Sequence, residues 1–119
     1  MSEFPLRDRT KALALRVIKV VNSLPHDEVG RVIGHQLLKS GTSVGANYRA
    51  SMRAKSPADM VNKLKIVEEE ADETVYWLEL LVDAQVIPQS KLQPLIAEAN
   101  EIVAMTVASI KTIRSQRGS

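Results

Sequence analysis

Apolar residues recur at three- and four-residue steps through four long segments of this chain, and this spacing constrains its fold more than any other feature. In the first segment, Leu13, Val17 and Leu24 fall on one face of a helix. No stretch alternates with the two-residue period of a β-strand. The pattern predicts helices over residues 8–24, 27–54, 57–84 and 90–115. Because short links join them, we predict an all-α, antiparallel up-down-up-down four-helix bundle, a single domain over residues 1–119.

Residues typical of helix ends support these boundaries. Pro25 is predicted to end the first helix, because the residue before a proline is disfavoured in the helical conformation. Before the third helix, Ser56 fits the N-cap and Pro57 the first helical position, which needs no N–H donor. Ser90 and Gln93 have the spacing of a capping box, which places the start of the fourth helix at Ser90.

The composition excludes several classes of protein. The chain has no cysteine, so disulfides and thiolate catalysis are excluded, and this absence is typical of a reducing compartment. No uncharged stretch exceeds nine residues, whereas a membrane-spanning helix needs about 20 largely apolar residues. Residues 1–5 lack the basic and apolar regions of a secretory signal. We therefore expect a cytoplasmic protein that does not enter a membrane.

Residue patterns that carry catalysis or hold a cofactor are missing from the sequence. The two histidines, His26 and His35, form no Glu-x-x-His pair of the kind that binds metal inside helical bundles. The densest carboxylate run, Glu68 to Glu70, spreads around a helix and does not converge on one ion. There is no P-loop and no nucleophile elbow. We predict no catalytic residue, no metal site, no cofactor and no enzymatic activity.

Charge is unevenly distributed along the chain, although the net charge is only +2. Residues 1–55 carry ten lysines and arginines against four acidic residues, whereas residues 56–88 carry two against eight. One interpretation is that the acidic third helix pairs with its basic neighbours inside the bundle. The other is that the first two helices present a basic surface to a polyanion.

Four of the five glycines lie in the second predicted helix, at Gly30, Gly34, Gly41 and Gly45. At 100° per residue they share a narrow arc of that helix. Glycine inside a helix costs about 1 kcal/mol relative to alanine, so four cost on the order of 4 kcal/mol unless close packing compensates. The row therefore predicts close approach of a neighbouring helix of the same bundle or, alternatively, of another subunit.

The opposite side of the second helix is basic. We select four residues there as candidate nucleic-acid-binding residues, with three residues of the first helix in support: Arg31, Lys39, Arg49 and Arg53, and then Arg9, Lys11 and Arg16. Arginine side chains on a rigid helix suit phosphate recognition, because their planar forks donate two hydrogen bonds to phosphate oxygens. The alternative is an ordinary solvated helix face.

Three polar residues of the second helix, Ser40, Ser43 and Asn47, are predicted to be buried between helices and to hydrogen-bond there. Two neighbouring aromatic residues of the third helix, Tyr76 and Trp77, are predicted to anchor the core or a subunit contact, with base stacking as the alternative.

Residues 36–48, QLLKSGTSVGANY, and residues 63–78, KLKIVEEEADETVYWL, resemble the helix-two and helix-three motifs of the 23S rRNA intervening-sequence proteins. The resemblance covers about residues 7–113. It departs at Tyr48-Arg49, where members often carry a smaller or acidic pair, so this helix-two surface is more basic. The family name records where some of its genes lie and does not establish rRNA binding.

The resemblance implies a four-helix bundle that assembles as a ring of five, a homopentamer. It also implies a distant similarity to the accessory variability determinant proteins of diversity-generating retroelements, which are basic pentamers that engage nucleic acid and a reverse transcriptase. From these observations we expect a non-enzymatic, oligomeric bundle that binds RNA or DNA weakly through phosphates. The alternative is a structural or adaptor protein that docks a protein partner through its acidic third helix.

Overall fold

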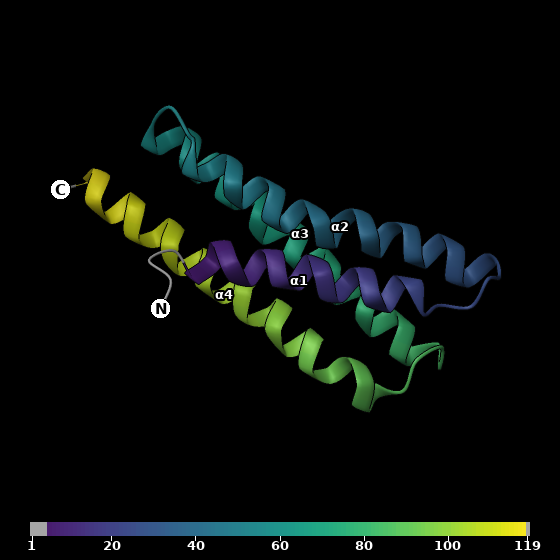
Figure 1. Ribbon diagram of the computed structural model, residues 1–119. Helices are drawn as coiled ribbons and strands as arrows, with labels where there is room; N and C mark the ends of the chain where they lie inside the picture. The colour runs from purple at the N-terminus through teal and green to yellow at the C-terminus, as the bar shows by residue number, and fades with distance from the viewer. Residues whose placement is uncertain (1–4, 119) are drawn as a thin grey trace.

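The computed structural model describes residues 5–118, with side chains as far as Gln116, and contains four helices (Figure 1). They are α1 (Pro5–Asn22), α2 (Glu28–Met52), α3 (Pro57–Asp83) and α4 (Gln89–Gly118). No β-strand occurs in this part of the chain, so the all-α prediction is confirmed. Residues 1–4 and Ser119 lie outside the described residues. The prediction that residues 1–5 lack the regions of a secretory signal therefore falls mostly outside them as well.

The helix ends follow the predictions at α3 and depart from them elsewhere. Ser56 is the N-cap of α3 and accepts a hydrogen bond from the backbone N–H of Asp59 at 3.1 Å. The capping box predicted for α4 is wrong: this helix begins at Gln89, so Ser90 lies inside it. It also continues to Gly118, past the predicted end at residue 115.

The ends of α1 and α2 also differ by a few residues from the predicted ones. α1 begins at Pro5, three residues before the predicted start, and ends two residues before the predicted end at residue 24. There the backbone N–H of Leu24 donates to the carbonyl of Val21 in a tight turn. α2 begins after Asp27, whose carboxylate caps it by accepting from the N–H of Gly30 at 2.8 Å.

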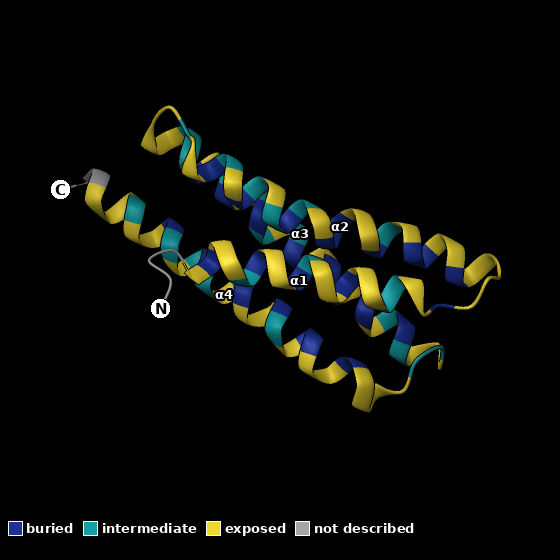
Figure 2. Ribbon diagram, viewed as in Figure 1, coloured by how far each residue is buried: buried dark blue, intermediate teal, exposed yellow. Residues whose placement is uncertain are grey.

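Figure 1 shows that successive helices run in opposite directions and form one elongated bundle. Helices adjacent in sequence pack against each other, while the contact between α1 and α4 is the smallest. Each helix turns its buried residues inward (Figure 2), and among the largest fully buried side chains are Leu13, Leu37, Leu78 and Ile102, one from each helix. The apolar periodicity therefore identified the core face of every helix correctly.

A buried hydrogen bond joins α2 to α3 inside the core. The hydroxyl of Thr74 donates to Ser40 Oγ at 3.0 Å and also lies 2.8 Å from the carbonyl of Glu70. The predicted buried role of Ser40 is thus confirmed. Ser43 and Asn47 do not have the buried position predicted for them, because both are only half-buried. The amide of Asn47 donates to the Ser43 carbonyl of its own helix.

The glycine row is explained by α1, which packs against α2 along it. A Cβ atom built on Gly41 would lie 2.8 Å from both methyl groups of Val17, and one on Gly34 would lie 3.1 Å from Leu24. At Gly30 the obstacle is backbone, because the Cβ would lie far inside van der Waals contact with the Pro25 carbonyl oxygen. Close packing within one bundle, the first of the two predicted explanations, is therefore confirmed.

Candidate nucleic-acid interface

A groove of about 720 Å³ runs between the first turns of α1 and the last turns of α2. Small residues form part of its lining, including Ala14, Gly45 and Ala46. Beside Gly45, the Thr10 backbone of α1 lies 3.4 Å from where a Cβ would be, which is ordinary van der Waals contact. The groove therefore lies along the contact between α1 and α2.

Four cationic side chains line this groove, and we call it the basic groove. Arg7 and Lys11 come from α1, Arg49 comes from the last turn of α2, and Arg53 is the C-cap residue of that helix. Each pair is spaced by four residues, so its members lie on the same side of their helix, about one turn apart. One carboxylate, Asp8, also lines the groove, with an oxygen 3.7 Å from the Arg7 guanidinium. Positive charge thus dominates the groove.

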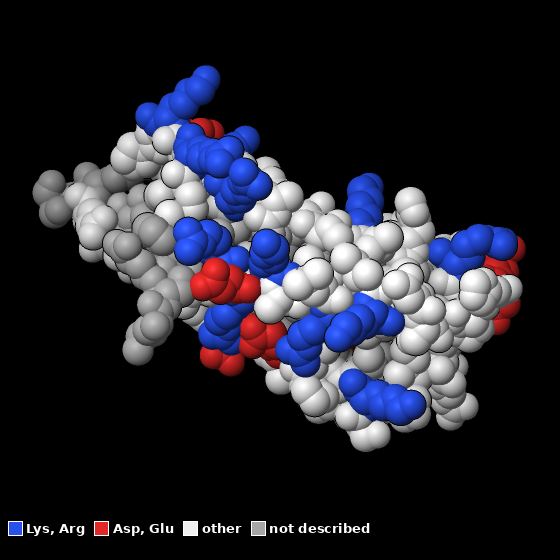
Figure 3. All heavy atoms as spheres, viewed as in Figure 1, with Lys and Arg blue, Asp and Glu red and all other residues white. Residues whose placement is uncertain are grey.

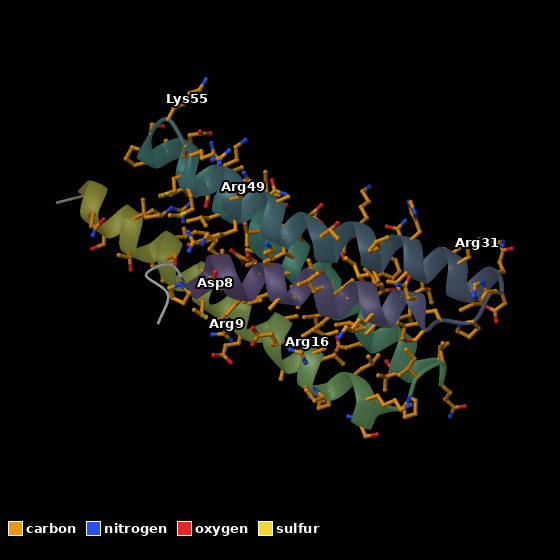
Figure 4. The ribbon with its side chains drawn as sticks, viewed as in Figure 1. Asp8, Arg9, Arg16, Arg31, Arg49 and Lys55 are labelled. Carbon is orange, nitrogen blue, oxygen red and sulfur yellow. The ribbon has the colours of Figure 1, made fainter. Side chains whose placement is uncertain are left out.

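Figure 3 shows one group of lysines and arginines at the end nearest the α2–α3 connection and others spread along the rest of the same face, with acidic residues between them. Arg49 extends outward from α2 near that connection, and Lys55 projects from the connection itself (Figure 4). Side chains of all four groove cations are exposed, so they remain hydrated and mobile enough to meet a phosphate backbone. Such a cluster attracts polyanions and raises their local concentration.

Three of the seven sequence-predicted binding residues come together in the basic groove: Lys11, Arg49 and Arg53. Arg7 completes the cluster but was not among the selected residues. The sequence contains a signal that would have identified Arg7 as a groove residue. Arg7 and Lys11 are four residues apart, so they lie on the same side of α1.

Arg9 and Arg16 lie on the other side of α1, toward α4. The guanidinium of Arg9 donates two hydrogen bonds to the carboxylate of Glu98, at 2.6 and 2.9 Å, and lies 3.2 Å from Glu101. The positive charge of Arg16 also acts on Glu98, adding to the effects of Arg9 that lower its pKa. Arg9 is therefore engaged in joining α1 to α4, and neither residue lines the basic groove.

The Arg9–Glu98 ion pair makes the stability of the bundle depend on pH. The Arg9 hydrogen bonds hold the pKa of Glu98 below its ordinary value, and burial only partly opposes them. A carboxylate whose pKa is lowered by folding stabilises the protein above its unfolded pKa, and this contribution is lost as the pH falls through the folded value.

We expect Glu98→Gln to lower the free energy of unfolding by about 1 kcal/mol at pH 7. The difference from the wild type should shrink as the pH falls below the ordinary pKa of glutamate and disappear only below the lowered folded pKa of Glu98, where the side chain is protonated in both folded and unfolded chains. Urea unfolding between pH 3 and 7 measures this, with the exposed Glu79→Gln as the control. A deficit as large at pH 3 as at pH 7 would contradict the assignment.

Arg31 and Lys39 are also separated from the basic groove. Arg31 lies at the opposite end of α2 (Figure 4) and pairs with Glu28 at 3.1 Å on the surface. Lys39 interacts electrostatically with Glu70 of α3. Burial and the charge of Glu73 raise the pKa of Glu70, and the positive charge of Lys39 partly opposes this rise. The four residues selected on the basic side of α2 therefore do not form one site, because Arg31 and Lys39 lie apart from Arg49 and Arg53.

The basic groove, lined by four cationic side chains and one carboxylate, has a charge that favours anionic groups such as phosphates. Among the described residues, no three histidine or carboxylate side chains gather where they could hold a metal ion. Within the same residues, no helix combines the length and apolar character needed to cross a membrane.

Comparisons with known proteins identify relatives of this chain. The family model described as 23S rRNA-intervening sequence protein matches residues 3–108. A solved structure from Bacteroides thetaiotaomicron, described as a protein of unknown function from the S23 ribosomal protein family, is similar with 36% sequence identity and a TM-score of 0.84. The similarity covers 89% of this chain and 98% of that one. No curated protein shows significant sequence similarity.

Proposed function

Because this chain belongs to the 23S rRNA-intervening sequence protein family, we propose that it is a non-enzymatic, oligomeric bundle that binds RNA or DNA through phosphates. The observation that carries this proposal is the basic groove, in which four exposed cations from two helices face one carboxylate. Cations arranged in this way replace the counterions of a phosphate backbone, and the released counterions favour binding. We place the protein in the cytoplasm, in keeping with its lack of cysteine.

Assembly as a homopentamer would strengthen such binding. Five copies of a chain with net charge +2 sum to +10, and the basic groove would be repeated five times. Each groove alone contacts few phosphates, but linked sites bind one polyanion with much higher overall affinity than single sites. The pentamer is implied by the family resemblance and is part of the proposal.

The test is the salt dependence of binding. We expect the purified, nuclease-treated protein to bind structured RNA and duplex DNA with micromolar dissociation constants at 50 mM salt. Affinity should fall by at least about 10-fold at 200 mM, because each neutralised phosphate adds about 0.9 to the logarithmic salt slope. Fluorescence anisotropy of labelled oligonucleotides measures both. Absence of binding at 50 mM salt would contradict the proposal.

A second candidate function is docking of a protein partner through α3. The observation that favours it is Tyr76, which is 55% exposed among acidic residues and packs edge-on against Trp77, with ring centroids 4.9 Å apart. Exposed aromatic residues are enriched at protein interfaces. Recovery of one specific protein from nuclease-treated lysate, lost on Tyr76→Ala, would favour this function over nucleic-acid binding.

A further inference from the structure

A largely apolar hollow lies at the end of the bundle formed by the last turn of α2, the start of α3 and the last turns of α4. It consists of two adjoining spaces of about 360 and 480 Å³, which share Met60 and Ile113 in their walls. Leu64 and Met52 also line the first space. α1 begins further inside the bundle and does not extend to this end (Figure 1), so three helices enclose the hollow where four enclose the core.

One polar side chain of this hollow, Tyr48, is only 8% exposed, and among the described residues its hydroxyl bonds to no other residue. Since no fully buried polar side-chain atom of these residues lacks a partner, the Tyr48 hydroxyl is open to solvent. The other hydroxyls in the lining are satisfied, because those of Ser51, Ser109 and Thr112 donate to carbonyls of their own helices at 2.6 to 3.0 Å. The Tyr48 hydroxyl is therefore available to donate to an acceptor atom of a bound ligand.

The Tyr48 hydroxyl keeps its proton at neutral pH. Burial raises the pKa of this phenol, and the positive charge of Arg7 acts against the rise. The group is therefore a hydrogen-bond donor. Its electrostatic interaction with Arg7 also ties the hollow to the basic groove, which Arg7 lines.

The hollow and the basic groove adjoin each other at Met52, which lines both. A ligand that fills the two sites must carry negative charge at one end and a compact, mainly apolar group with a hydrogen-bond acceptor at the other. A nucleotide with an unpaired base meets these requirements, because its base has apolar faces and acceptor atoms on its edge. Methionine side chains also contact aromatic rings favourably.

We infer that the hollow receives an unpaired base of a nucleic acid whose neighbouring phosphates lie in the basic groove. This inference rests on the proposed function and adds the class of nucleic acid that binds. In a continuous duplex every base is stacked and paired, so none reaches the hollow. Ends, bulges and loops present bases that are free to leave the stack. The protein therefore prefers such strands over blunt duplexes of equal charge.

The test compares two hairpins with the same number of phosphates, both closed by a non-nucleotide linker in place of a base loop, one blunt and one with a single-stranded 3′ overhang. In protein with ¹³C-labelled methionine methyl groups, the overhang should shift the signals of Met52 and Met60, because a base ring lies beside them. Met105, whose sulfur lies 3.0 Å from the Arg9 guanidinium, is the internal reference and should stay unchanged. The blunt hairpin should bind with a similar salt slope and leave Met60 unshifted.

Two variants and a matched control sharpen the test. Tyr48→Phe keeps the ring and removes the donor, so we expect affinity for the overhang hairpin to fall about three- to tenfold and affinity for the blunt one to be unchanged. Ala108→Leu places a larger side chain in the lining and should abolish the preference. Ala104→Leu, one turn earlier on the same side of α4 but outside the lining, is the matched control and should retain it.

The outcomes separate this inference from the proposed function. Equal binding of both hairpins, with equal methyl shifts, would overturn the inference and leave phosphate binding intact. Failure of both hairpins to bind at 50 mM salt would overturn the two together. Shifts of Met52 and Met60 with dodecyl phosphate but not with the overhang would identify an acyl-chain site and overturn the inference.

Discussion

Replacing Arg49 and Arg53 with glutamine is expected to weaken binding of RNA and duplex DNA on the order of 10- to 100-fold at 50 mM salt. The two arginines form the α2 side of the basic groove and are exposed, and within the described residues neither forms an ion pair that would compensate its charge. If each contacts one phosphate, the logarithmic salt slope should decrease by about 1.8. The loss should be similar for different sequences, because phosphates carry no base identity.

The control for this variant removes the same charge elsewhere. Lys91→Gln combined with Arg114→Gln changes two exposed residues of α4, outside the groove. Anisotropy titrations at several salt concentrations should show a smaller loss and a nearly unchanged slope. If both double variants lose affinity equally, binding depends on total charge and the basic groove is not the site.

Gly30→Ala is expected to lower the free energy of unfolding by about 2 kcal/mol, although alanine is the better helix former. The new methyl group would overlap the carbonyl oxygen of Pro25, which belongs to the backbone of the α1–α2 connection. A flexible side chain could rotate away, whereas this carbonyl moves only if the connection shifts. Asp27, whose carboxylate caps α2 at the same place, would move with it.

Gly45→Ala is the matched control in the same helix. Its methyl group would lie 3.4 Å from the nearest atom of Thr10, which is ordinary van der Waals contact. We expect no loss and a gain of about 0.5 to 1 kcal/mol from helix propensity. Urea unfolding followed by circular dichroism measures both variants. Equal stability of the two would show that the α1–α2 connection adapts freely and that the packing argument fails.

The sequence predicted the fold better than the helix ends. The core face of each helix is encoded by apolar spacing, which many residues repeat, so no single misleading residue alters it. An end depends on one or two residues and on tertiary contacts. At α4, Ser90 and Gln93 have the spacing of a capping box, yet the helix begins one residue earlier and includes Ser90.

The candidate site was predicted less completely, because it depends on neighbours that are distant in the sequence. The spacing of Arg49 and Arg53 placed them on one side of α2, as the structure has them. No periodicity within α1 indicates that Arg9 meets Glu98, which is 89 residues away. Likewise, the influence of Lys39 on Glu70 follows from the packing of α2 on α3.

The small contact between α1 and α4 has a consequence for how binding and folding are linked. α1 packs mainly on one neighbour, α2, whereas α2 and α3 each pack on two. Separation of α1 therefore breaks the fewest interhelical contacts, and it would remove Arg7 and Lys11 from the groove. A ligand that bridges both walls binds only the docked arrangement and stabilises it by mass action. Ligand binding in the groove should therefore slow the hydrogen exchange of backbone amides along the whole length of α1.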